Sequence, residues 1–137
     1  MAVRAGAGMR YGSSVVWIKS MRLAARVIVI SRRLPAEERY GLRSQITRAA
    51  TSVPSNIAEG WVRESSKEKV RFMSIAHGSL AELHTQLLLC EDVGLLTGPD
   101  LAEPLALIDE IARMLTTIKR KWRTRSPLPR PNYAPPD

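Results

Sequence analysis

The densest run of charge in the chain is basic and lies near its C-terminal end. It consists of Lys119, Arg120, Lys121, Arg123 and Arg125. Cations at such density can neutralise the phosphates of a nucleic acid, and they can also offset the negative end of a helix dipole. Because the run exceeds what a helix dipole requires, it is a candidate phosphate-binding site. Trp122 lies within the run, but its place in the helical period favours core packing over stacking on a base.

A second basic set follows the segment 36–59, which we expect to be helical. Its members are Arg39, Arg43 and Arg48, and Arg32 and Arg33 come shortly before it. Like the C-terminal run, these side chains are candidate contacts for phosphate groups.

Polar residues in or beside apolar stripes form a third candidate, consisting of Asn56, Glu59, Ser79 and Glu82. The two glutamates could serve as paired carboxylates in acid–base catalysis or metal binding. However, the Glu-x-x-His pattern of metal-binding helical bundles is absent, because Val62 and Thr85 occupy the positions where histidine is required. We favour a buried polar network that holds two helices together, with Arg48 as the countercharge. No catalytic residue, metal ligand or cofactor is predicted.

The remaining reactive side chains form no recognisable site. His77 and His84 share a helical face, but two turns separate them by about 10 Å, too far for one metal ion. The sequence contains no nucleophile elbow, phosphate loop or dinucleotide fingerprint. Cys90 is expected to be a small core hydrophobe. These patterns favour a protein that is not an enzyme.

Composition indicates helices that pack on helices. The 137-residue chain is long enough for one domain, and it is 45% hydrophobic but only 5% aromatic. The net charge of +8 favours a polyanionic partner, although ordinary solubility of an arginine-rich chain is an alternative. The apolar segment 15–30 contains Lys19, Arg22 and Arg26, so no membrane span is expected. The single cysteine excludes an internal disulfide and indicates a cytoplasmic protein.

Apolar residues at steps of three and four predict four helices in a bundle that spans residues 14–125. We expect the helices at 14–33, 36–59, 66–93 and 100–123. Residues 1–13 are expected to form a flexible extension, and the proline-rich residues 126–137 a disordered tail. Short connections between long periodic segments favour an up-down antiparallel order.

Local signals mark the ends of these helices. Gly60 is expected to end the second helix in a left-handed conformation, and Gly94 to end the third. Ser65 and Glu68 form a capping box at the start of the third helix, and the segment 97–100 reads as a turn.

The predicted buried faces follow from the same spacing. In the first helix the face consists of Trp17, Met21, Ala24, Ile28 and Ser31. In the second helix it includes Leu42, Ile46, Val53 and Ile57.

A specific signature runs from the segment 45–60, which ends in Asn-Ile-Ala-Glu-Gly, through Arg63, Ser66, Glu68, Phe72, Ile75, Ala76, Gly78, Ser79 and Glu82. It resembles the four-helix-bundle proteins encoded in intervening sequences of bacterial 23S rRNA genes. It is more distantly similar to the accessory protein of diversity-generating retroelements. The similarity covers about Trp17 to Trp122. It implies an up-down bundle, usually assembled as a ring of five, and no settled biochemical activity.

The residues and the resemblance together predict a non-enzymatic homopentamer that binds nucleic acid through phosphate contacts. The preference for RNA over DNA follows only from the rRNA association of the relatives. A ring would repeat each basic patch five times, and multivalent contact would strengthen weak binding. The alternative is a scaffold for a protein partner, such as a reverse transcriptase or another acidic protein.

Overall fold

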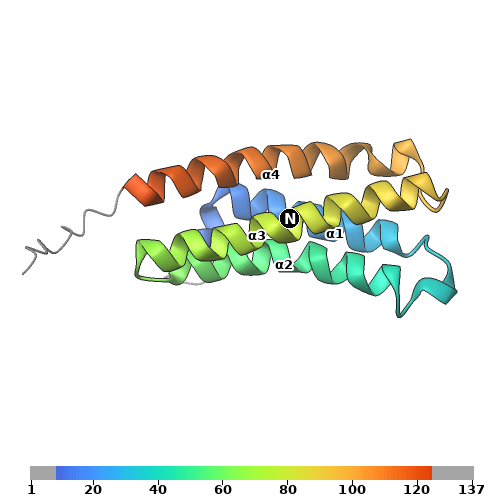
Figure 1. Cartoon of the computed structure of the whole chain (residues 1–137), viewed down its shortest axis with the longest axis horizontal. Coiled ribbons are helices and arrows are strands. Elements are labelled where there is room, and N and C mark those ends of the chain that lie inside the picture. The colour runs from blue at the N-terminus through green and yellow to red at the C-terminus, as the bar shows by residue number, and fades with distance from the viewer. Residues whose placement is uncertain (1–8, 125–137) are drawn as a thin grey trace, which may run out of the picture.

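The computed structural model describes residues 9–124, which form four helices packed as a bundle (Figure 1). The elements are η1 (Arg10–Ser13), α1 (Val15–Ser31), η2 (Ala36–Glu38), α2 (Leu42–Val62), α3 (Ser66–Asp92) and α4 (Gly98–Thr124). Each long helix packs against the next and α4 returns to α1, so the helices enclose one core. The predicted all-α four-helix bundle is confirmed. Expectations for residues 1–8 and 126–137, and for Arg125, lie outside the described residues. Residues 10–13, which were expected to belong to a flexible extension, instead form η1, which contacts α1 and α2 and places the Tyr11 ring 5.2 Å from that of Trp17.

The face that α1 buries differs from the predicted one. Its buried side chains are Val16, Ser20, Leu23, Ala24, Val27, Ile30 and Ser31. The predicted Trp17, Met21 and Ile28 are only half-buried. Apolar residues surround much of this helix, so their spacing alone does not select a face. With this face buried, Lys19, Arg22 and Arg26 of α1 pair with carboxylates on α4. The spacing of apolar residues did not predict these ion pairs.

The second helix begins later than predicted. Residues 36–38 form the short 3-10 helix η2, and α2 starts only at Leu42. Gly41 separates the two elements with φ −102° and ψ −112°, outside the helical region. The Glu38 carboxylate accepts a hydrogen bond from the Leu42 amide at 3.4 Å and thereby caps the new helix start. The predicted buried face of α2 is otherwise correct, with Ile46, Val53 and Ile57 fully buried.

Gly60 does not end α2 in a left-handed conformation, contrary to prediction. It lies inside the helix, which continues to Val62. A Cβ atom at Gly60 would lie 2.6 Å from Met73 Cε and 2.9 Å from Phe72 Cβ on α3. Glycine is therefore needed here because two helices approach closely.

The other helix ends follow the sequence signals more closely. Ser65 Oγ accepts a hydrogen bond from the Glu68 amide at 3.1 Å, as the capping box predicts. Gly94 has φ 77° and ends α3. The expected turn at 97–100 is instead the first turn of α4, because the Asp100 carboxylate accepts hydrogen bonds from the amide and hydroxyl of Thr97.

No helix within residues 9–124 combines the length and apolar character needed to cross a bilayer.

Candidate nucleic-acid interface

The C-terminal end of α4 lies beside the end of α2 and the first turns of α3 (Figure 1). The Trp61 and Trp122 rings meet edge to face with 5.1 Å between their centroids. This contact brings the basic run of α4 to the same end of the bundle as four cations from the α2–α3 region. We call this group the basic end; it comprises Arg63, Lys67, Lys69, Arg71, Lys119, Arg120, Lys121 and Arg123.

Two members of the basic end serve the packing of the bundle. Lys69 Nζ donates a hydrogen bond to the Trp61 carbonyl at 2.7 Å and lies 5.3 Å from the centre of the Trp122 ring. Burial lowers the pKa of Lys69. Lys119 Nζ lies 3.1 Å from His77 Nδ1, and burial, followed by the charge of Arg123, lowers the pKa of Lys119. Trp122 therefore packs between helices, in agreement with its place in the helical period.

Two other members hold carboxylates of neighbouring turns. Arg63 pairs with Glu59 at 2.7 Å, and Arg71 pairs with Glu68 at 3.5 Å. Both guanidinium groups also lie over the ring of Phe72. The positive charge of each of these two arginines is therefore offset by a neighbouring carboxylate.

Four exposed cations of the basic end have no ion-pair partner within the described part of the chain. They are Lys67, Arg120, Lys121 and Arg123. Lys67 and Arg123 also line a shallow groove of about 290 Å³ beside Trp122. Lys67 and Arg123 are thus unpaired cations from two helices in one groove, which suits the binding of a phosphate, and Arg120 and Lys121 lie on the same last turns of α4.

A second basic site lies at the opposite end of the bundle, where α1 ends and α2 begins. A groove of about 470 Å³ is lined there by Arg32, Arg39, Arg43, Tyr40 and Ser44, among others. We call it the arginine groove. None of its three arginines forms an ion pair with a residue in the range 9–124. The structure thus brings the predicted Arg39 and Arg43 together and adds Arg32.

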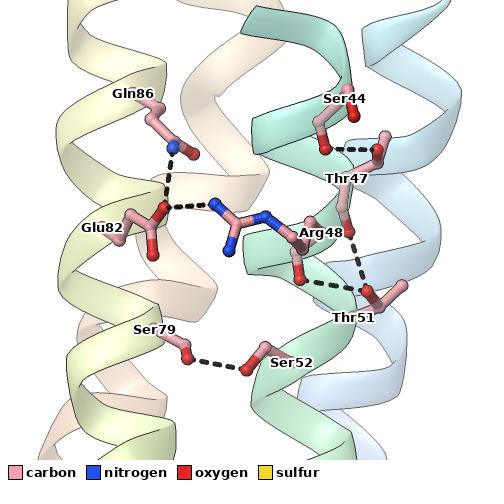
Figure 2. Close-up of polar contacts among 8 residues, drawn as sticks. All are labelled: Ser44, Thr47, Arg48, Thr51, Ser52, Ser79, Glu82 and Gln86. Atoms are coloured by element: carbon pink, nitrogen blue, oxygen red, sulfur yellow. Dashed lines mark hydrogen bonds and ion pairs between the residues drawn. The ribbon is translucent and has the colours of Figure 1, made fainter. Parts of the chain in front are cut away.

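Arg48 lies apart from this groove and takes the countercharge role instead. Figure 2 shows its guanidinium extending from α2 toward Glu82 on α3, with Nη2 and Oε1 3.3 Å apart. Gln86 donates a further hydrogen bond to the same carboxylate oxygen at 3.1 Å. The pair is solvent-exposed, with 69% and 43% of the two side chains accessible, so it is not the buried network that we expected.

Hydroxyl groups make a second link between α2 and α3. Ser52 Oγ and Ser79 Oγ lie 2.8 Å apart (Figure 2), and the Asn56 amide donates to Ser52 Oγ at 2.9 Å. Glu59 takes no part, because it pairs with Arg63 on its own helix. Ser79 and Glu82 therefore contact α2 as a link between the two helices would, whereas the hydrogen bonds of Asn56 and the ion pair of Glu59 do not reach α3.

The arrangement does not bring Glu59 and Glu82 together as a carboxylate pair, since each binds a different arginine. Within residues 9–124, no three histidine, cysteine or acidic side chains are grouped to hold a metal ion. The sequence analysis did not include Lys67 in a basic site, whereas it placed Arg32 close to Arg39 and Arg43. The capping box at Ser65 was a usable signal for Lys67, because it places the start of α3 at the same end as the end of α4 in an antiparallel bundle.

Comparison with known proteins agrees with this architecture. A family model described as 23S rRNA-intervening sequence protein matches residues 13–117. A solved structure from Bacteroides thetaiotaomicron, described as a protein of unknown function from the S23 ribosomal protein family, is also similar. It shares 25% sequence identity and a TM-score of 0.72, over 77% of this chain and 99% of that one. None of the curated proteins matches. The chain therefore belongs to the family of 23S rRNA-intervening sequence proteins.

Proposed function

We propose that the protein is a non-enzymatic, oligomeric bundle that binds nucleic acid, with RNA preferred, through its basic surfaces. The observation that supports this most strongly is that Lys67, Arg120, Lys121 and Arg123 lie at one end of the bundle without ion-pair partners among the described residues, and that two of them, Lys67 and Arg123, line one groove. Phosphate contacts of this kind position a nucleic acid but carry little sequence information. The preference for RNA rests on the rRNA association of the family.

The charges on another surface of the bundle provide a contrast. Between α1 and α4, Lys19 pairs with Glu110 at 2.6 Å, and Arg22 and Arg26 both pair with Glu103 at 3.1 and 3.2 Å. On the outer side of α4, Arg113 pairs with Asp109. Phosphate would have to compete with these carboxylates, whereas at Lys67, Arg120, Lys121 and Arg123 it would not.

We further propose that the subunits assemble as a homopentameric ring. Val15, Ile18 and Val29 are 56%, 40% and 50% exposed. Together with Arg22 and Ala25 they form a row with steps of three and four residues, which lies on one face of α1. Such a face would be covered by a neighbouring subunit. The number five is supported by the family resemblance alone. A ring would present each basic site five times.

A protein-interaction scaffold is the alternative function. It is favoured by Leu89 and Val93, which are 49% and 60% exposed near the end of α3 and could bind a protein partner. The partner would be acidic, for example a reverse transcriptase with an acidic docking surface, because the unpaired arginines of the arginine groove lie at the same end of the bundle as Leu89 and Val93.

Two charge variants with equal net charge test the proposed site. The first replaces Lys67, Arg120, Lys121 and Arg123 with glutamine. The matched control replaces the ion-paired Lys19, Arg26, Arg33 and Arg113 with glutamine. Each variant loses four positive charges, and circular dichroism would check that both remain folded.

The basic-end variant should lose affinity for a structured RNA, and the slope of log K against log salt should become shallower by roughly 3. The control should stay within about threefold of the wild type, since its cations already bind carboxylates. Equal losses in the two variants would show that binding follows net charge alone. An unchanged basic-end variant would remove this surface from the interface.

A further inference from the structure

The arginine groove combines features that the basic end lacks. Three guanidinium groups, from Arg32 at the end of α1 and from Arg39 and Arg43 at the start of α2, line one groove together with the ring of Tyr40. Its volume of about 470 Å³ lies within the roughly 300–1,000 Å³ typical of sites for small molecules. The groove is thus large enough to take a nucleotide-sized unit as well as a phosphate.

The charge of the groove comes from the arginines. The end of α1 at Ser31 and the start of α2 at Leu42 bring dipole ends of opposite sign to the same place, so their effects offset each other. The nearest acidic groups of η2 are Glu37 and Glu38, and the Glu38 carboxylate is turned to the amide of Leu42. Arg33 does not contribute, because it pairs with Asp100 on α4. The groove therefore keeps three positive charges.

Tyr40 is the most exposed large hydrophobic residue among the described ones, with 90% of it accessible to solvent. Its exposure leaves the ring free to contact a ligand. Tyr40 lines the same groove as Arg39 and Arg43, and an exposed ring is a suitable surface for a nucleobase, whose flat face stacks on aromatic side chains whatever the base. Only an unstacked base can do so, which selects single strands and loops over duplexes.

We propose that the arginine groove binds one nucleotide of a single-stranded nucleic acid segment, with its base stacked on Tyr40 and the flanking phosphates held by Arg32, Arg39 and Arg43. This inference rests on the proposed nucleic-acid function and assigns a distinct ligand to this end of the bundle. The hydroxyl of Ser44, which lines the same groove, is placed to contact the sugar or a phosphate.

The test uses the full chain and two fluorescein-labelled probes with the same sequence, a single-stranded 10-nucleotide RNA and its duplex. Tyr40→Ala removes the ring, Tyr40→Leu keeps apolar bulk without a π face, and Tyr40→Phe keeps the ring without the hydroxyl. Arg39→Gln with Arg43→Gln removes two of the groove charges. Because Tyr40 has no packing role, thermal melts should show that the Tyr40 variants keep wild-type stability.

Tyr40→Ala and Tyr40→Leu should weaken binding of the single strand by about 5- to 150-fold, while duplex binding changes less than twofold. Tyr40→Phe should bind the single strand as the wild type does. The double arginine variant should make the salt slope for the single strand shallower by roughly 1.4.

Suppose that the wild type binds both probes. If Tyr40→Ala then changes the affinity for both probes equally, or for neither, the stacking site is wrong and the nucleic-acid function stands. If the wild type binds neither probe at low salt, the nucleic-acid function fails and this inference fails with it. The two failures are therefore distinguishable in one experiment.

Discussion

At the scale of single residues, two glycines in helices test the close approach of α2 and α3. Gly60→Ala should lower the free energy of unfolding by about 1–3 kcal/mol, even though alanine favours a helix. Met73 Cε could move away from the new methyl group, but Phe72 Cβ at 2.9 Å could not unless α3 shifted. Chemical denaturation would measure the change.

Gly78 provides the matched control for this substitution. It also lies in a helix, but no atom would lie within 4 Å of a Cβ there. Gly78→Ala should therefore raise stability by up to about 1 kcal/mol. A Gly60→Ala variant as stable as Gly78→Ala would contradict the tight contact between the helices.

The contact of His77 with Lys119 makes stability depend on pH. Burial, followed by the charge of Lys119, lowers the pKa of His77 below its ordinary value of 6.5. The unfolded chain therefore binds a proton at a higher pH than the folded chain does. The contribution of neutral His77 should be complete above pH 6.5 and decrease as the pH falls below that value toward the folded pKa.

Melting curves from pH 7.5 to 5.5 would check this, with His77→Gln as the control that lacks the group. The wild type should lose more stability on acidification than His77→Gln does. Lys119→Met should raise the pKa of His77, which an NMR titration of the imidazole would detect. A lower pKa in that variant would contradict the assigned electrostatic cause.

At the scale of helices, the cap of α3 can be tested separately from its packing. Ser65→Ala removes the oxygen that accepts from the Glu68 amide and should cost about 1 kcal/mol of stability. Ser74→Ala changes an exposed serine of the same helix that is not at its end, so it should be neutral or slightly stabilising. Equal effects of the two substitutions on the denaturation midpoint would argue against the cap.

Local chemistry explains which helix features could be predicted. The capping box at Ser65 and the left-handed Gly94 depend on neighbouring residues only, so the sequence contained the needed information. The buried face of α1 depends on its neighbours, since apolar residues occur on several sides of that helix. The prediction that Gly60 ends α2 was wrong for the same reason, because the need for glycine there is set by Met73 and Phe72 on another helix.

The candidate site was predictable to a similar extent. The basic residues of α4 follow one another closely in the sequence, so they were predicted as one group. Arg39 and Arg43 lie four residues apart, so they were predicted as neighbours. Lys67 was not predicted, since it reaches the groove beside Arg123 only through the packing of α3 against α4. The sequence allowed two roles for Arg48, a phosphate contact or a countercharge, and its ion pair with Glu82 on α3 agrees with the second.

At the scale of the whole molecule, the proposed assembly would use the exposed apolar residues of α1. Ile18→Glu with Val29→Glu should convert the proposed ring to monomers, because each charge would be buried without a partner at the interface. Native mass spectrometry would measure the change. As a control, Val62→Glu introduces a charge at an exposed residue at the end of α2 and should leave the mass of the assembly unchanged.

The central claim is that unpaired cations bind phosphate, and the most direct measurement is a titration of wild-type protein with a structured RNA at several salt concentrations. Wild-type protein should bind at about 50 mM salt, and a plot of log K against log salt should be straight. Its slope should be at least about 3 in magnitude, as four phosphate contacts per subunit require. No binding at low salt by folded protein, or binding that does not change with salt, would contradict it.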